Sequence, residues 1–234
     1  MKVERVLIKI SGEALSGAEG IFDSQAISGV CSNIKNVVDS GVKVCLVVGG
    51  GNIIRGRDFQ NCRFMITETA DTVGMLSTVM NCVIMRDALA SCGMSVAAVS
   101  TLHLPFNILS NDIYTLNRLL PSNDVVIFCG GIGLPYFSTD TVAVVAAIMA
   151  RCNVLLKATK TDGIYDLDPR LFANAQYIPE LTHSDAIRRC LSVMDQTAFE
   201  VASKYKLPIY VFSASEPNCF ARAINGEIKM SVAR

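Results

Sequence analysis

Three consecutive glycines carry the clearest chemical signal in the sequence. Gly49, Gly50 and Gly51 follow the apolar run 44–48, and Arg55 comes a few residues later. A glycine turn lets backbone N–H groups approach a bound group closely, because no Cβ stands in the way. If the turn opens a helix, its unpaired N–H groups and the helix dipole favour an anion. The alternative is a tight turn that only joins a strand to a helix, but three glycines and a nearby arginine favour a phosphate.

This turn does not match the common phosphate-binding fingerprints. Neither Gly-x-x-x-x-Gly-Lys-Ser/Thr nor Gly-x-Gly-x-x-Gly occurs in the chain. A second glycine turn, at residues 130–133, ends another apolar run. His103 and His183 are the only histidines, and neither has a Cys or His at metal-ligand spacing, which argues against a zinc site. We therefore expect a different nucleotide-binding fold.

The composition narrows the class of partner. Lysine plus arginine and aspartate plus glutamate both total 21, so no net charge favours a nucleic acid or an anionic membrane. The apolar run 142–150 is too short to span a bilayer, and the first residues lack the apolar region of a signal peptide. Cys31, Cys45, Cys82 and Cys129 lie in apolar stretches or on helix faces, as is typical of reduced core thiols. We expect a soluble, cytoplasmic protein.

Strand and helix patterns alternate along the chain. Strands are expected at 3–10, 42–48, 94–99, 125–129, 153–157 and 208–212. Helices are expected from Asp23 to Gly41, then at 68–91, 110–120 (stopped by Pro121), 140–150, 184–191 and 195–204. This alternation predicts an α/β fold, a three-layer sandwich whose central, mainly parallel sheet is covered by helices on both faces. No linker interrupts the pattern, so residues 1–234 are expected to form a single domain.

Four of the predicted strands end in residues suited to phosphate binding. These ends are the segment 9–12, which begins with Lys9, the two glycine turns, and the segment 157–163, which contains Lys157 and Lys160. Ligand sites in open α/β sheets lie at the carboxyl ends of the strands. The four ends should therefore converge on one crevice.

Eight short motifs occur in order and at compatible spacing. They are residues 9–15, 49–52 with 55–56, 71 with 74–75, 85–89, 133–140, 156–163 with 165 and 168–169, 193–195, and 207–209. Each alone is weak, but together they resemble the amino-acid kinase family over nearly the whole chain, and most closely its members that phosphorylate uridine monophosphate (UMP). The resemblance implies the amino-acid kinase fold. It also implies an enzyme that phosphorylates UMP to UDP with Mg²⁺ and ATP in pyrimidine nucleotide biosynthesis.

The resemblance also implies residues for each nucleotide. For ATP they are Lys9, Ile10, Ser11, Gly12, Gly51, Arg55, Thr159, Tyr165 and Asp168. For UMP they are Gly50, Asp71, Ile132, Gly133, Leu134, Pro135, Tyr136, Phe137, Ser138 and Thr139. The chemistry agrees, since a triphosphate needs cations and N–H donors, and a carboxylate can accept from ribose hydroxyls. The alternatives are a half-buried surface aromatic for Tyr165 and a helix first-turn charge for Asp71.

Phosphoryl transfer between nucleotides requires alignment and charge neutralisation rather than a protein nucleophile. The phosphate of UMP has a second pKa near about 6, so at neutral pH it can attack without a general base. Lys9 is expected to neutralise the transferred group, with Lys157 or Lys160 as a second cation and Mg²⁺ held mainly by ATP. Asp140 and Asp195 are candidates for orienting Lys9 and the metal waters, or alternatively each only caps a helix.

Two positions depart from the pattern of the family. Ile132 and Leu134 stand where members that phosphorylate UMP commonly carry Thr and Asn, so the side-chain hydrogen bonds expected there must be lost or replaced by backbone groups. The loop 17–22 is shorter than in many relatives, and Ala90 and Ala97 stand where relatives that respond to GTP often have polar or basic residues. These differences argue against activation by GTP.

The resemblance implies a homohexamer, with the helix 68–91 at an interface, and an allosteric nucleotide, inhibitory UTP. ATP and UMP are the expected partners, without a nucleic acid or a membrane. Two other functions stay open: a family member acting on a carboxylate, carbamate or isopentenyl phosphate, and a regulatory protein that binds UTP or UMP without turnover. Asp71 and the segment 133–140 argue against the first. Lys9, Arg55 and Asp140 together argue against the second, because a sensor needs no transition-state lysine.

Overall fold

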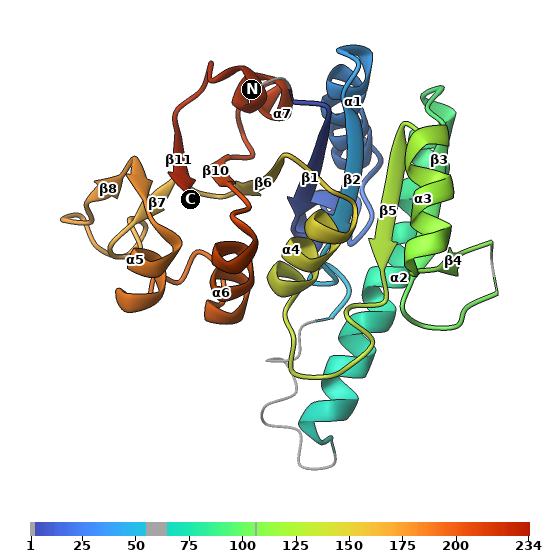
Figure 1. The fold of residues 1–234 in the computed structure, drawn as a ribbon, viewed down its shortest axis with the longest axis horizontal. Coiled ribbons are helices and arrows are strands. Elements are labelled where there is room, and N and C mark those ends of the chain that lie inside the picture. Colours follow the sequence, from blue (N-terminus) through green and yellow to red (C-terminus); the bar gives the residue numbers. More distant parts are fainter. Residues whose placement is uncertain (1–2, 55–64, 106) are drawn as a thin grey trace.

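One nine-stranded sheet runs through the protein. The computed structural model describes residues 3–54, 65–105 and 107–234. In sheet order the strands are β4 (Leu109–Ser110), β3 (Val96–Ser100), β5 (Val125–Cys129), β2 (Lys43–Val48), β1 (Arg5–Ile10), β6 (Val154–Thr159), β10 (Ile209–Ser213), β11 (Met230–Ala233) and β9 (Glu180–Leu181). Among these described strands only β10 and β11 pair antiparallel (Figure 1). The carboxyl ends of β1, β2, β5 and β6 therefore lie at one edge, as predicted.

Helices cover both faces of this sheet. On one face lie α1 (Ser24–Asp39), α2 (Thr67–Ser91) and α7 (Cys219–Asn225), and on the other lie α3 (Ile113–Ser122), α4 (Thr139–Met149), α5 (His183–Arg188) and α6 (Gln196–Tyr205). Within β1, Val6 and Ile8 belong to the first core and Leu7 to the second, because successive strand side chains point to opposite faces. The prediction of a three-layer α/β fold with a mainly parallel sheet is confirmed.

The six strands predicted from the sequence are the six longest in the sheet, with five or six residues each. The prediction missed the short elements: β4, β9, β11, the separate pair β7 (Ile164–Tyr165) and β8 (Tyr177–Ile178), the 3-10 turn Gly12–Leu15, and α7. Such segments are too short to show a period of their own. Cys31, Cys45, Cys82 and Cys129 are all buried, as predicted.

Helix α3 differs from its prediction at both ends. The Asp112 side chain accepts hydrogen bonds from the N–H groups of Tyr114 (3.0 Å) and Thr115 (2.9 Å), so the helix begins after this cap. At the other end Pro121 lies inside the last turn and does not stop the helix at residue 120. Asn123 donates both its backbone and side-chain N–H groups to the carbonyl of Leu119, at 3.1 and 2.9 Å, which keeps that turn closed.

The glycine turn after β2 does not open a helix within the described residues. The N–H groups of Ile53 and Ile54 both donate to the carbonyl of Gly50, at 3.0 and 3.1 Å, and this is a single turn. The next helix in the described part of the chain, α2, begins at Thr67. The expected helix after the turn is therefore wrong for residues 49–54, and no helix dipole acts there. Arg55 lies outside the described residues.

By length and composition alone, α2 is long and apolar enough to cross a membrane. It packs on β3, β5 and α1 instead, and Met85 and Leu89 are fully buried in the core against them. A core helix of this kind passes the same test as a membrane span. We therefore treat α2 as part of the fold, and its N-terminal half approaches the site described next.

Candidate active site

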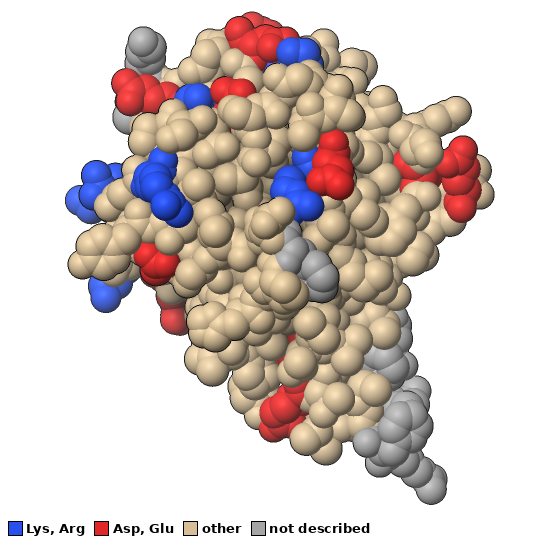
Figure 2. Space-filling model, turned by 90° about the vertical axis from the view of Figure 1, so that its right-hand side faces the viewer, with Lys and Arg blue, Asp and Glu red and all other residues tan. Residues whose placement is uncertain are grey.

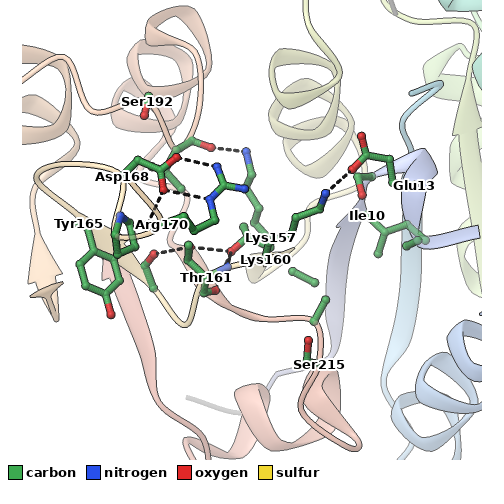
Figure 3. Close-up of a pocket in the computed structure, with 18 of the residues that line it drawn as sticks. Ile10, Glu13, Lys157, Lys160, Thr161, Tyr165, Asp168, Arg170, Ser192 and Ser215 are labelled. Atoms are coloured by element: carbon green, nitrogen blue, oxygen red, sulfur yellow. Dashed lines mark hydrogen bonds and ion pairs between the residues drawn. The ribbon is translucent and has the colours of Figure 1, made fainter. Parts of the chain in front are cut away.

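A cavity of about 500 Å³, called here the larger cavity, opens beside the carboxyl ends of β1 and β6 (Figure 3). Its walls come from the end of β1, the loop between β6 and β7 and the segment after it, and short stretches near residues 192 and 214. The predicted ATP residues that line it are Lys9, Ile10, Ser11, Thr159, Tyr165 and Asp168, and the candidate cations Lys157 and Lys160 line it as well. Strand ends far apart in the sequence thus meet in one cavity.

Three charged side chains, which we call the Lys–Asp–Lys cluster, border this cavity through their two lysines, Lys9 and Lys157. The Lys9 ammonium lies 2.9 Å from one carboxylate oxygen of Asp140, and the Lys157 ammonium lies 2.6 Å from the other. Only 8–15% of each side chain is exposed. Lys157 also donates to the carbonyl of Val193. Lys9 and Lys157 are register partners on the adjacent strands β1 and β6, which explains why both reach the same carboxylate.

Burial sets the charge state of the cluster. It lowers the pKa of Lys157 to about 8, although the Asp140 carboxylate acts in the opposite direction. Burial also acts to raise the pKa of Asp140, but Lys157 and Lys9 outweigh it, so that pKa lies below its ordinary value. At neutral pH the cluster holds two ammonium groups and one carboxylate. Its surplus positive charge faces the cavity, where it can attract an anion.

Asp140 and Asp195, the two candidate carboxylates, have different surroundings. The cap of α4 is Ser138, so Asp140 lies in the first turn and is not the helix cap. Asp195 is the cap of α6 and accepts from the N–H of Ala198 at 2.8 Å, which supports the capping alternative. Its carboxylate also accepts hydrogen bonds from Ser138 and Thr141. Neither Asp195 nor Asp140 lines the cavities described here. Asp195 thus ties α6 to the start of α4.

Two ion pairs at the rim of the larger cavity were not foreseen. Lys160 lies 2.9 Å from Glu13, and its side chain is 69% exposed. Arg170 contacts Asp168 through two nitrogens, at 3.0 and 2.7 Å, and this hydrogen-bonded guanidinium lowers the pKa of Asp168 to about 2 (Figure 3). The second pair could have been predicted from the sequence, because Asp168 and Arg170 carry opposite charges and are separated only by Pro169.

Neighbouring side chains hold the Tyr165 ring. Its hydroxyl donates to Asp162 at 2.7 Å, and its ring meets that of Tyr177 edge-on, with centroids 5.5 Å apart. Lys229 forms an ion pair with Asp162 at 2.6 Å and lies 4.2 Å from the Tyr177 ring centroid. Tyr165 is half-buried, as the alternative assumed, but these contacts fix it at the wall of the larger cavity, which Asp168 also lines.

A second cavity of about 210 Å³, called here the smaller cavity, lies between α2 and the second glycine turn. The predicted UMP residues that line it are Gly50, Asp71, Leu134, Phe137 and Thr139. Ile132, Gly133, Pro135, Tyr136 and Ser138 are not in its wall. Ile132 packs instead against one apolar core.

Contacts at the N-terminal end of α2 shape the smaller cavity. The Asp71 carboxylate accepts from the backbone N–H of Tyr136 at 2.7 Å, and the Tyr136 hydroxyl contacts Glu68. Asp71 is therefore more than a first-turn charge, because it holds the segment after the second glycine turn on α2. Tyr136 has φ +74°, a left-handed conformation that this contact stabilises.

The two predicted phosphate loops touch each other. A Cβ added to Gly12 would lie 2.3 Å from Asn52 Oδ1, 2.4 Å from the carbonyl of Gly49 and 2.8 Å from Gly51 N, so only glycine fits at this position. Gly12 itself is buried and supports Ser11 from behind. Gly51, which was predicted to bind ATP, lines the smaller cavity, whereas six other predicted ATP residues line the larger one.

The two cavities flank the Lys–Asp–Lys cluster. Lys9 and Lys157 line the larger cavity, while Thr139, the neighbour of Asp140 in α4, lines the smaller one. An anion in the larger cavity therefore lies beside both ammonium groups, and the wall of the smaller cavity includes the residue next to Asp140. This arrangement suits transfer of an anionic group from a ligand in one cavity to a ligand in the other.

Comparison with known proteins agrees with this geometry. The sequence profile of the Amino acid kinase family matches residues 4–213. The uridylate kinase of Thermotoga petrophila is 39% identical over 225 residues, which cover 95% of this chain and 96% of that protein. The uridylate kinase of Rickettsia prowazekii is 40% identical over 225 residues, with 96% and 93% covered.

Solved structures give the same result. The UMP kinase of Bacillus anthracis superposes with a TM-score of 0.93 at 31% identity, covering 100% of this chain and 97% of that one. The UMP kinase of Ureaplasma parvum superposes with a TM-score of 0.92 at 28% identity, covering 100% and 99%. The agreement extends over the full sheet and its helices.

Proposed function

Because the chain belongs to the amino acid kinase family, we propose that it is a nucleoside monophosphate kinase that transfers the γ-phosphoryl group of ATP to UMP. The relatives named uridylate kinase cover nearly all of the chain, which supports this activity. The observation that carries the proposal is the position of the Lys–Asp–Lys cluster between two cavities of unequal size. ATP, the larger nucleotide, is assigned to the larger cavity and UMP to the smaller one.

The larger cavity offers each part of ATP a matching group. Ser11 and the backbone that follows it, with Lys160, lie where phosphates can be bound, while Tyr165 offers a ring face and Asp168 a carboxylate to the adenosine part. Lys160 forms an ion pair with Glu13 in the structure. A phosphate that binds Lys160 would therefore replace the Glu13 carboxylate as its partner. Arg55 lies outside the described residues, and its role in binding phosphate remains part of the proposal.

The reaction needs no protein nucleophile. A UMP phosphate oxygen, already ionised at neutral pH, attacks the γ-phosphorus of ATP in line, and ADP leaves. Lys9 and Lys157 supply positive charge where the transferred group passes, and Asp140 fixes both ammonium groups before substrates arrive. Charged groups that are already oriented stabilise the transition state without reorganising during the reaction. Asp195 acts one step further out, by holding the start of α4 that carries Asp140.

Magnesium fits this site as an ion that ATP brings with it. Among the described residues no group of three His, Cys, Asp or Glu side chains is placed to hold a metal. Mg²⁺ prefers oxygen ligands and commonly combines substrate phosphates with one or two carboxylates. The phosphates of ATP would supply most ligands, and Asp140, whose two oxygens pair with Lys9 and Lys157, would orient waters of the ion rather than bind it directly. Bound Mg²⁺ would add positive charge to that of Lys9 and Lys157.

We also propose that the chain forms a single domain and acts as a cytoplasmic homohexamer inhibited by UTP. The continuous sheet with a core on each face supports one domain. Support for association comes from large apolar side chains exposed on or next to α2 and α3, which flank the β4 end of the sheet from its two faces: Ile66, Leu76, Met80, Ile113 and Tyr114. In Figure 2 much of this side of the molecule is free of charged residues. Such patches commonly mark interfaces.

An assay of acceptors tests the proposed function. The purified protein, with Mg²⁺ and ATP, is offered UMP, CMP, dTMP and acetylglutamate separately, and ADP formation is followed. We expect turnover with UMP above all others. Turnover with acetylglutamate instead would identify a different branch of the family. Binding of ATP and UMP without ADP formation would favour a regulatory protein and overturn the catalytic proposal.

A further inference from the structure

The middle of α2 contains a fully buried polar side chain that the mechanism has not used. Asn81 is 0% exposed and lies in an otherwise apolar stretch of the helix, next to Cys82 and two residues from Val79. Its side-chain nitrogen donates a hydrogen bond to the carbonyl of Gly49 at 2.7 Å. A buried amide is costly unless its partners are satisfied, so these partners are strongly specified.

Asn81 also pairs with a second amide. It donates to Asn52 Oδ1 at 2.8 Å, and Asn52 donates back to Asn81 Oδ1 at 3.0 Å. Asn52 makes a further bond to the carbonyl of Ile21 at 3.0 Å. The two amides therefore attach both ends of the glycine turn to α2: Gly49, its first residue, and Asn52, the residue after its last glycine.

The opposite side of the glycine turn is closed by backbone. Gly49 N donates to the carbonyl of Ile10 at 3.0 Å, and Gly12 packs so tightly that a Cβ would overlap the carbonyl of Gly49. A Cβ on Gly50 would lie 2.7 Å from Ser77 Cβ in α2. The turn is thus clamped between the Gly12 loop and α2, and the Asn81 amide is its polar anchor on the helix side.

The position of this turn affects both cavities. Gly50 and Gly51 line the smaller cavity, while the Gly12 loop that packs against them continues from Lys9 and Ser11 in the wall of the larger one. Displacement of Gly49 would therefore move the two nucleotides relative to each other. We propose that Asn81 is a positioning residue for phosphoryl transfer, which acts through Gly49 and Asn52 to set the alignment of donor and acceptor. This inference rests on the proposed function.

Loss of Asn81 should affect the rate more than binding. Every group that lines the two cavities is kept in the variant, and a small shift of the turn still leaves each nucleotide able to bind in its own cavity. In-line attack, however, requires the two reacting atoms in near-contact, and small misplacements from a distant change can lower a rate about 100-fold. A core asparagine that only stabilises the fold would lower the melting temperature and leave kcat unchanged.

The test is steady-state kinetics of Asn81→Leu, which keeps the side-chain size and removes both hydrogen-bonding groups. We expect kcat for UMP-dependent ADP formation to fall at least about tenfold, with the KM values for ATP and UMP changed less than about threefold. Asn153→Leu is the matched control. Asn153 Oδ1 accepts from the N–H groups of Glu4 and Arg5 at 2.8 and 3.0 Å, at the opposite end of β1. It should lower the melting temperature and leave kcat within about twofold.

The outcomes separate the inference from the proposed function. An active wild type together with a folded Asn81→Leu whose kcat lies within about twofold overturns the inference alone. A wild type that forms no ADP with UMP overturns the proposed function and this inference together. Should Asn81→Leu fail to fold, Asn52→Ala replaces it, because Asn52 is only half-buried. It should lower kcat at least about threefold with KM retained, and an unchanged kcat there also overturns the inference.

Discussion

The buried ammonium of Lys157 should give this enzyme a pH dependence that can be traced to one residue. Burial lowers its pKa to about 8 in the free protein. Below that pH the side chain is charged and can neutralise phosphate, and above it the charge is lost. At pH 9 about a tenth of the molecules keep the charge, so kcat/KM for ATP should fall roughly tenfold between pH 7 and pH 9.

The pH profile distinguishes kcat/KM from kcat. The value of kcat/KM reports the free enzyme and should begin to fall near pH 8. In the enzyme–substrate complex the bound phosphates favour the charged form of Lys157, so kcat should begin to fall only at a higher pH. Lys157→Arg should move the turn out of the accessible range, since a guanidinium stays charged. Lys160→Met is the matched control, because Lys160 lines the same cavity but is 69% exposed. It should keep the turn near pH 8.

Titration of Lys157 does not itself destabilise the fold at high pH. The pKa of Lys157 is lower in the folded protein than its ordinary value of 10.5, so between pH 8 and 10.5 the unfolded chain binds more protons at this residue. Its own contribution to the free energy of unfolding therefore rises with pH in that window, opposite to the rate. A kcat/KM for ATP that stays flat from pH 7 to 9.5, or a turn that persists unchanged in Lys157→Arg, would refute the assignment.

Three substitutions test other parts of the site. Lys9→Met should lower kcat roughly 100-fold or more with little change in UMP affinity, because it removes one oriented charge; a rate within about twofold of wild type would contradict this. Asp71→Asn should weaken UMP binding in calorimetry by about 1.5–3 kcal/mol, and ATP binding less; equal losses would remove the assignment of Asp71 to the acceptor. Gly12→Ala should lower the free energy of unfolding by roughly 1–3 kcal/mol, because the new Cβ would meet the carbonyl of Gly49. The melting temperature and kcat should fall with it. A variant with unchanged melting temperature and kcat would show that the two loops are not in close contact.

Local patterns predicted the elements and the strand-end residues well. The long strands and helices show clear periods, and a lysine at the end of a buried strand, such as Lys9 or Lys157, is placed at the sheet edge by the strand itself. The sequence named Asp140 as a candidate for orienting Lys9, and the two lie 2.9 Å apart, but the pairing of Asp140 with Lys157 was not predicted. For Asp195 the sequence left two readings open, and the structure supports the helix cap.

Contacts between distant elements were beyond local patterns. Asn81 donates a hydrogen bond to Gly49, 32 residues away in the sequence. The only local sign of this contact is that Asn81 is an amide in an otherwise apolar stretch of the helix. Arg170 was overlooked because an exposed surface charge has no periodic signature, and the glycine turn was expected to open a helix because such turns often do. In each case the outcome depends on packing of one segment against another, which a single sequence does not encode locally.

The proposed mechanism is direct transfer of a phosphoryl group from ATP to UMP at the Lys–Asp–Lys cluster. The stereochemical course at phosphorus measures this claim. ATP made chiral at the γ-phosphorus with oxygen isotopes and sulfur is incubated with Mg²⁺, UMP and the protein, and the configuration of the thiophosphoryl group in the UDP product is determined by ³¹P NMR. One in-line displacement predicts inversion. Retention, or a labelled phosphoprotein recovered before UDP forms, would contradict the account.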